Sequence, residues 1–97
     1  MHAASGYFLR CDILSGLRPE PARLCEGDWT GVSMLETKRA GAVCAGDTVY
    51  DRSAPVLGYG RAWVRNGFRC VSRRSGLTCT NRRSNGFFLS RERWRVF

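Results

Sequence analysis

The chain has 97 residues, of which 43% are hydrophobic and 11% aromatic, a composition that excludes an intrinsically disordered protein. No stretch reaches the roughly 20 apolar residues of a membrane-spanning helix, so we expect no transmembrane segment. The formal net charge of +8 is unevenly placed: residues 1–60 hold 6 basic and 7 acidic side chains, whereas residues 61–97 hold 10 arginines and 1 acid. The last third of the chain therefore carries the whole positive excess.

The first half of the chain predicts a strand, a linker and a hairpin. Residues 7–14 are apolar enough for a partly buried strand, and Gly16 followed by two prolines favours an extended linker. Residues 28–37 and 41–45 predict a hairpin. A single helical turn is the alternative for the first of these two segments, because it contains the Ser-x-x-Glu pattern of a capping box.

A strand over residues 61–72 leads into the most informative hairpin of the chain. Pairing Ser72 with Leu77 leaves a four-residue loop that ends in glycine, a residue that tolerates the positive φ such loops need. The same register places Cys70 opposite Cys79. The two sulfur atoms are therefore predicted to meet across the strands.

Side-chain alternation separates the two faces of this hairpin. Phe68, Cys70 and Ser72 share one face, and Arg69 and Val71 share the other. We expect the first face to lie in the core and the second to be exposed to solvent.

The end of the chain adds a strand over residues 86–90 and a closing segment with Trp94, Val96 and Phe97 at the sheet edge. Eleven glycines divide the chain into short segments and leave no room for long helices. The sequence thus predicts a single mostly-β domain over residues 1–97. We expect a small antiparallel sheet built from hairpins, curled into a barrel-like or sandwich arrangement and stapled by disulfides.

A Ser-Gly pair precedes Cys11 as another precedes Cys79, which indicates a second copy of the hairpin at the N-terminus. We take the four residues before Ser5 to be too few for its first strand. That strand, with a cysteine, is therefore expected to lie before Met1 in a longer form of the protein.

The five cysteines include no Cys-x-x-Cys pair, and His2 is the only histidine. We therefore expect no metal and no cofactor, and no Cys–His nucleophile pair. We therefore expect the cysteines to form disulfides, which imply an oxidising compartment. The first ten residues lack the pattern of a signal peptide, so reduced thiols remain the alternative. Five cysteines allow fifteen choices of two bridges, and the register argument directly supports only Cys70–Cys79.

Arginines alternate with aromatic side chains over residues 61–97, a pattern that suggests an anion-binding surface. The candidate contact residues are Arg69, Arg73, Arg74, Arg82, Arg83 and Trp63. In a secreted protein the partner would be an anionic envelope polymer or a lipid surface. Nucleic acid held by stacking aromatics is less favoured, because no recognised nucleic-acid motif accompanies the pattern. The remaining alternative is a solvated face whose aromatic residues belong to the core.

No constellation of catalytic groups appears in the sequence, so we expect that the protein is not an enzyme. An enzyme would have to bring together acids such as Asp47, Asp51 and Glu92, which we expect to be scattered. Asp47 is better suited to capping a turn than to acid–base work or calcium binding. Gly58-Tyr59-Gly60 lacks the third glycine of a dinucleotide-binding loop and indicates a turn.

Several segments carry a resemblance that extends over nearly the whole chain from Leu9. They are Arg10-Cys11-Asp12-Ile13, Cys25, Cys44-Ala45-Gly46-Asp47-Thr48, Leu57-Gly58-Tyr59-Gly60, Gly67-Phe68-Arg69-Cys70-Val71-Ser72, Gly76-Leu77-Thr78-Cys79-Thr80-Asn81 and Gly86-Phe87-Phe88-Leu89-Ser90-Arg91. Together they resemble a family of small uncharacterised domains from actinobacteria. Its members look like exported or lipid-anchored envelope proteins with six cysteines, the first in a Ser-Gly-Asn-Ile-x-Cys segment that this chain lacks.

The resemblance implies that Cys25 pairs with Cys44 and Cys70 with Cys79, which leaves Cys11 unpaired. It also implies a secreted or envelope location, and it agrees with an N-terminal truncation. The sequence therefore predicts a domain of unknown function that acts without catalysis as a binding or structural module. The alternative is a basic nucleic-acid-binding protein that uses residues 61–97.

Overall fold

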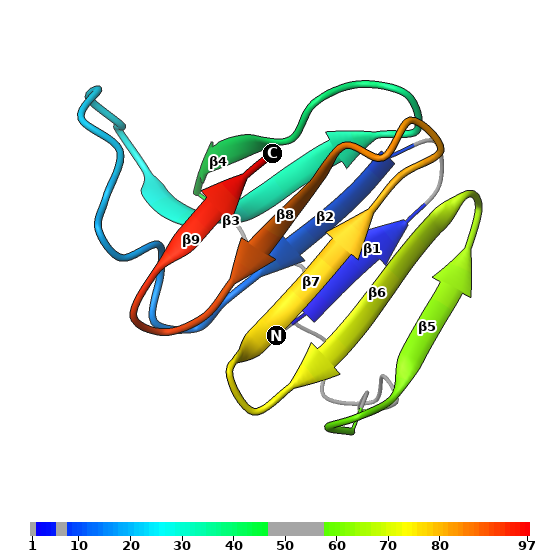
Figure 1. Ribbon diagram of the computed structural model, residues 1–97. Coiled ribbons are helices and arrows are strands. Elements are labelled where there is room, and N and C mark those ends of the chain that lie inside the picture. Colours follow the sequence, from blue (N-terminus) through cyan, green and yellow to red (C-terminus); the bar gives the residue numbers. More distant parts are fainter. Residues whose placement is uncertain (1, 6–7, 47–57) are drawn as a thin grey trace.

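Two antiparallel sheets packed face to face make up the part of the protein that the computed structural model describes, residues 2–5, 8–46 and 58–97 (Figure 1). The four-stranded sheet has the order β1-β2-β3-β4 and the five-stranded sheet the order β5-β6-β7-β8-β9. The strands are β1 (His2–Ser5), β2 (Phe8–Asp12), β3 (Asp28–Leu35), β4 (Gly41–Ala45), β5 (Ala62–Arg65), β6 (Phe68–Arg73), β7 (Gly76–Thr80), β8 (Gly86–Leu89) and β9 (Trp94–Val96).

The fold class predicted from the sequence is confirmed. The described residues contain strands and turns but no α-helix, and every strand pairing is antiparallel. The arrangement is a sandwich and not a closed barrel, because within these residues each sheet ends in two edge strands. Figure 1 shows the five-stranded sheet in front of the four-stranded one, and β8 contacts β3 across the gap.

Residues within the chain form a strand beside β2, where we expected a strand from before Met1. β1 pairs with β2 from His2 opposite Asp12 to Ser5 opposite Leu9. The expectation that four residues are too few is wrong, because a strand at the edge of a sheet needs hydrogen bonds to one neighbour only. In this register Ala3, and not a cysteine, stands opposite Cys11.

The single strand predicted over residues 61–72 is also wrong, since the chain turns back in the middle of it. Arg65 pairs with Phe68, so that Asn66 and Gly67 form a two-residue turn between β5 and β6. Their φ angles are 53° and 83°, and a type I′ turn requires positive φ at both central positions. Asn-Gly is the strongest short-range hairpin signal in a sequence, and the prediction of one strand gave it no weight.

The β6–β7 hairpin has the predicted register, with Cys70 opposite Cys79. Its turn is tighter than predicted, because Arg73 also pairs with Gly76 and leaves two residues instead of four between the strands. Gly76 has φ 148°, and a Cβ atom there would lie 2.7 Å from a carbonyl oxygen of β8. Only glycine fits this position without displacing the backbone. The predicted hairpin of β3 and β4 is confirmed as well, and the alternative helical turn does not occur.

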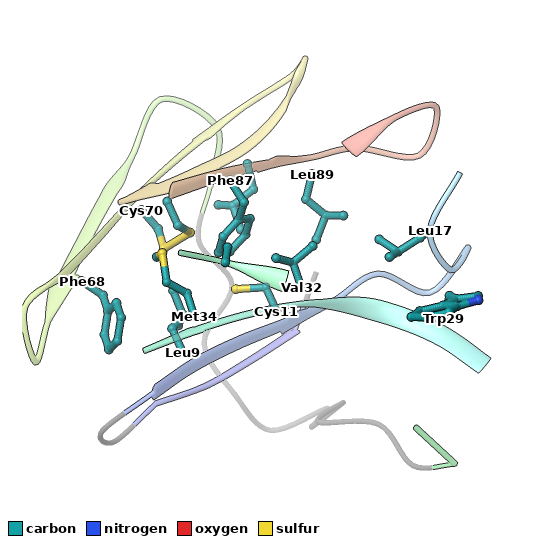
Figure 2. Packing of buried hydrophobic residues seen from close by; sticks show 13 residues of the cluster. Leu9, Cys11, Leu17, Trp29, Val32, Met34, Phe68, Cys70, Phe87 and Leu89 are labelled. Atoms are coloured by element: carbon teal, nitrogen blue, oxygen red, sulfur yellow. A yellow bond between two sulfur atoms is a disulfide. The ribbon is translucent and has the colours of Figure 1, made fainter. Parts of the chain in front are cut away.

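One hydrophobic core lies between the two sheets (Figure 2). It consists of Leu9, Cys11, Trp29, Val32 and Met34 from one sheet, Phe68, Cys70, Leu77, Cys79, Phe87 and Leu89 from the other, and Leu17 and Ala40 from connecting segments. The predicted division of β6 into faces is confirmed, because Phe68, Cys70 and Ser72 are buried while Arg69 and Arg73 are exposed. The inner face of the five-stranded sheet is therefore occupied by packing and leaves its outer face to solvent.

Two disulfides reinforce this small core. Cys70–Cys79 joins β6 to β7, and Cys25–Cys44 ties the linker between β2 and β3 to β4. Cys11 is free and buried. The pKa of its thiol is raised to about 12, chiefly by burial and in smaller part by the neighbouring Asp12 carboxylate. Near neutral pH this sulfur is thus a packed, neutral thiol.

We expect Cys11 to resist alkylation in the folded protein at pH 8, because the thiolate that reacts does not form well below the raised pKa. Intact mass after iodoacetamide treatment checks this. The expected count is no adduct in the native state, 1 in unreduced denaturant, and 5 after reduction. Rapid native modification, or more than one adduct without reduction, contradicts the packing and the bridges.

Asn81 links the turns of the two sheets at one end of the sandwich. Its Nδ2 atom donates to the carbonyl oxygens of Leu35 at 2.9 Å and Lys38 at 2.8 Å. Its Oδ1 atom accepts the backbone N–H groups of Arg83 at 3.0 Å and Asn85 at 3.1 Å. The side chain is buried, so all of its hydrogen-bonding capacity serves the contact between the β3–β4 turn and the β7–β8 turn.

The substitution Asn81→Ala should lower the free energy of unfolding by about 2–3 kcal/mol, because it removes four part-buried hydrogen bonds, two of which join the turns of the two sheets. Urea denaturation followed by tryptophan fluorescence measures this. Asn85→Ala is the matched control, since no side-chain hydrogen bond of Asn85 is seen within the described residues, and it should cost less than about 1 kcal/mol. Equal losses for the two variants would remove this role from Asn81.

Candidate functional site

The outer face of the five-stranded sheet collects exposed arginines through simple strand alternation. On β6, inward Phe68, Cys70 and Ser72 leave Arg69 and Arg73 outward. On β9 the half-buried Trp94 and Val96 pack against the core, so Arg95 lies on the opposite face with Arg93 preceding it. These four arginines are all exposed.

The strand register places these side chains around a neutral floor. One row runs from Val71 through Thr78 and Phe88 to Arg95. The next row runs from Arg69 through Thr80 to Gly86, which exchanges backbone hydrogen bonds with Phe97. We call this surface the outer arginine face; it comprises Arg69, Arg73, Arg93 and Arg95 together with Val71, Thr78, Thr80, Phe88 and Phe97. Two arginines thus flank it on β6 and two at β9, as the strand order in Figure 1 shows.

Two phenylalanine rings hold the arginines at the β9 side. The Arg93 guanidinium carbon lies over the Phe88 ring, 5.0 Å from its centroid, and that of Arg95 lies over the Phe97 ring at 5.5 Å. The tips of both rings rest against glycine backbone, since a Cβ atom at Gly76 would come within 2.7 Å of the Phe88 ring and one at Gly86 within 2.9 Å of Phe97. Guanidinium groups over aromatic faces are attracted by the ring quadrupole and lose part of their freedom.

Electrostatically the outer arginine face is positive without compensation. No acidic residue lies on β5 to β9, and the acid nearest in the chain is the exposed Glu92 in the β8–β9 turn. Among the described residues, none of its four arginines forms an ion pair. Arg82 lies outside this surface and makes a 3.7 Å ion pair with Glu36. The four guanidinium groups therefore keep their donors available for an external anion.

The structure brings together only part of the predicted contact set. Arg69 and Arg73 belong to the outer arginine face. Arg74 lies in the β6–β7 turn, 6.0 Å from the Tyr59 ring, whereas Arg82 and Arg83 lie in the β7–β8 turn at the other end of the hairpin. Trp63 pairs with Cys70, packs against the core and lies on the inner side of the sheet.

Arg93, Arg95 and Phe88 belong to the arginine- and aromatic-rich run within residues 61–97 but not to the six residues predicted as contacts, and Phe97 belongs to neither. The alternation Arg-Trp-Arg-Val-Phe over residues 93–97 does contain the signal, because it assigns both arginines and Phe97 to one face of a short strand. The pairing of Phe88 with Arg95 across strands has no counterpart in the local sequence, since it depends on the β8–β9 register.

The acids considered for catalysis do not form a site in the described residues. Asp47 and Asp51 fall outside these residues, and Glu92 stands exposed in a turn. An open hollow of about 300 Å³ is lined by Asp12, Glu20 and Asp28, but Asp12 is already ion-paired with Arg10 at 3.0 Å. No group of three or more His, Cys, Asp or Glu side chains suited to a metal occurs in the described part of the chain.

A comparison with known families places the chain. A family of unknown function, DUF6636, matches residues 10–97. The chain belongs to this family. No curated protein and no solved structure matches the chain. In the described part of this DUF6636 member, no helix has the length and apolar character needed to cross a membrane.

Proposed function

We propose that this DUF6636 protein is a non-catalytic module of the actinobacterial cell envelope or extracellular space, and that its outer arginine face binds an anionic polymer. The observation that carries the proposal is the set of four exposed arginines on a sheet without a single acidic residue. Uncompensated positive charge on one face raises the local concentration of polyanions and speeds their encounter. The two disulfides support an oxidising compartment, in which such bonds persist.

A polymer fits this surface better than a lipid bilayer. The centre of the outer arginine face holds Val71, Thr78 and Thr80, none of which is fully exposed. Beside it on β5, Val64 stands opposite Arg69 and is 70% exposed, so the exposed apolar side chains are single residues at the margins and form no continuous row for insertion. Phe97 is 41% exposed at its margin. A ligand that lies along the sheet reaches all four guanidinium groups, whereas membrane binding gains most from apolar residues that enter the interface.

The nucleic-acid alternative loses its stacking platform. Phe68 and Phe87 are fully buried, and Trp63 and Trp94 pack against the core. The Trp94 indole also donates to the Pro19 carbonyl oxygen at 2.7 Å. Of the aromatic residues in this pattern, only Phe88 lies on the outer arginine face, and the Arg93 guanidinium already lies over its ring. No row of free aromatic faces is therefore left for successive bases to stack on, and phosphate contacts would carry most of the binding.

Binding should depend steeply on salt. Four arginines that each neutralise one anionic group predict a slope of about −3 in a plot of log affinity against log salt concentration. The double variant Arg93→Gln/Arg95→Gln should weaken binding and reduce the magnitude of this slope by about 1.4. Calorimetric titration with an anionic polymer such as poly(glycerol phosphate) provides the measurement.

The charge-matched control is Arg18→Gln/Arg39→Gln, which removes two exposed arginines that lie outside the five-stranded sheet. This control should retain the slope of the unmodified protein. If the two double variants lose affinity equally, binding follows total charge and not the outer arginine face, and the proposed site is rejected.

A further inference from the structure

The spacing of the arginines along the strands carries information about the ligand. Arg93 and Arg95 are two residues apart and face the same side, which separates their Cα atoms by about 6.5–7 Å. Arg69 and Arg73, on β6, are four residues apart and thus separated by about 13 Å. The second separation is twice the first. Because the strands of one sheet run side by side, the Arg93–Arg95 pair and the Arg69–Arg73 pair therefore follow the same spacing along the strand direction.

This repeat matches a particular covalent chain. Alternate Cα atoms of a strand are separated by the same number of bonds as successive phosphorus atoms in a phosphodiester polymer with a three-carbon linker. An extended polymer of this kind, lying parallel to β7, therefore presents phosphates in step with the arginines on either side. A polyuronate such as polygalacturonate carries one carboxylate on every sugar, and the rigid rings between these charges give no comparable match.

The two phenylalanine rings give the β9 side its geometry. Arg93 lies over Phe88 and Arg95 over Phe97, and the glycine backbone at Gly76 and Gly86 allows each ring to rest on the sheet. A guanidinium fork held in this way matches phosphate oxygens in a bidentate manner at a lower entropic cost than a free side chain. The rings serve here as positioning groups for anion contacts, and a guanidinium already lies over each of them.

We infer that the outer arginine face recognises the backbone of a base-free phosphodiester polymer with a three-carbon repeat, and that Phe88 and Phe97 position the arginines that contact its successive phosphates. The inference rests on the proposed function and names the ligand class of the same face. It gives the rings a positioning role and assigns no energy to base stacking.

The test compares affinities of the full chain for four probes of similar length by fluorescence anisotropy at one ionic strength. The probes are poly(glycerol phosphate), an abasic deoxyribose phosphate oligomer, oligothymidylate and polygalacturonate. We expect the first two to bind with equal affinity, oligothymidylate to bind no tighter than the abasic oligomer, and polygalacturonate to bind at least about tenfold more weakly. Tighter binding of oligothymidylate than of the abasic oligomer would show base stacking and overturn the inference.

Two variants test the positioning role. Phe88→Leu removes the ring without changing charge and should weaken poly(glycerol phosphate) binding by about two- to fivefold. Arg93→Lys keeps the charge and the fold but lacks the fork, and it should lower the preference for poly(glycerol phosphate) over polygalacturonate. Tyr59→Leu is the matched control, because it removes the ring of the Arg74–Tyr59 pair, which lies outside the outer arginine face.

The outcomes separate this inference from the proposed function. If both Phe88→Leu and Arg93→Lys behave as the unmodified protein while Arg93→Gln/Arg95→Gln still loses affinity, the phosphodiester reading is overturned and the anion-binding face stands. If polygalacturonate binds as tightly as poly(glycerol phosphate), the preference for phosphodiesters is likewise overturned, and the anion-binding face still stands. If Arg93→Gln/Arg95→Gln binds every probe as the unmodified protein does, both fail.

Discussion

The pairing of Cys70 with Cys79 fixes the register of β6 and β7, and the two faces of the five-stranded sheet depend on that register. A slip of one residue would turn every inward side chain of a strand outward. The disulfide blocks such a slip covalently, and it sits in the core beside Phe87 (Figure 2). The same alternation that buries the sulfur atoms sends Arg69 and Arg73 to solvent, so that core packing and surface charge follow from one constraint.

A disulfide and a set of side-chain hydrogen bonds add to the stability that the small core of this sandwich provides. Cys25–Cys44 closes a loop for which the chain-entropy account gives about 3 kcal/mol, and it anchors the linker that brings Leu17 into the core. Asn81 joins the turns of the two sheets through a fully used amide. The outer arginine face takes part in none of these contacts. Substitutions on it can therefore change binding with little change in the fold.

Most of the segments that form strands could be predicted from the sequence, but some of the pairings between strands could not. The β6–β7 register could be predicted because Cys70, Cys79 and a glycine-containing turn lie within a few residues of each other. The turn at Asn66 was equally local, and it was missed because the Asn-Gly pair within residues 61–72 was given no weight. The pairing of β1 with β2 was missed because an edge strand without long apolar side chains leaves little pattern in four residues.

The candidate site divides in the same way. Arg69 and Arg73 could be assigned to one face from alternation alone, whereas Arg82 and Trp63 were included for their composition and lie elsewhere. The contact of Arg93 with Phe88 requires the β8–β9 turn to place residues five apart in sequence against each other. Such contacts depend on register and on glycine backbone beneath the ring, which neither charge nor hydrophobicity in the sequence reports.

A titration of the ¹⁵N-labelled protein with poly(glycerol phosphate), followed by amide chemical shifts, tests the central claim most directly. The account predicts that the largest shift changes occur at residues of the outer arginine face, such as Arg69, Thr78, Phe88 and Arg95, and that the linker between β2 and β3 is unaffected. Changes centred on that linker or on the four-stranded sheet, or no changes at low salt, would contradict it.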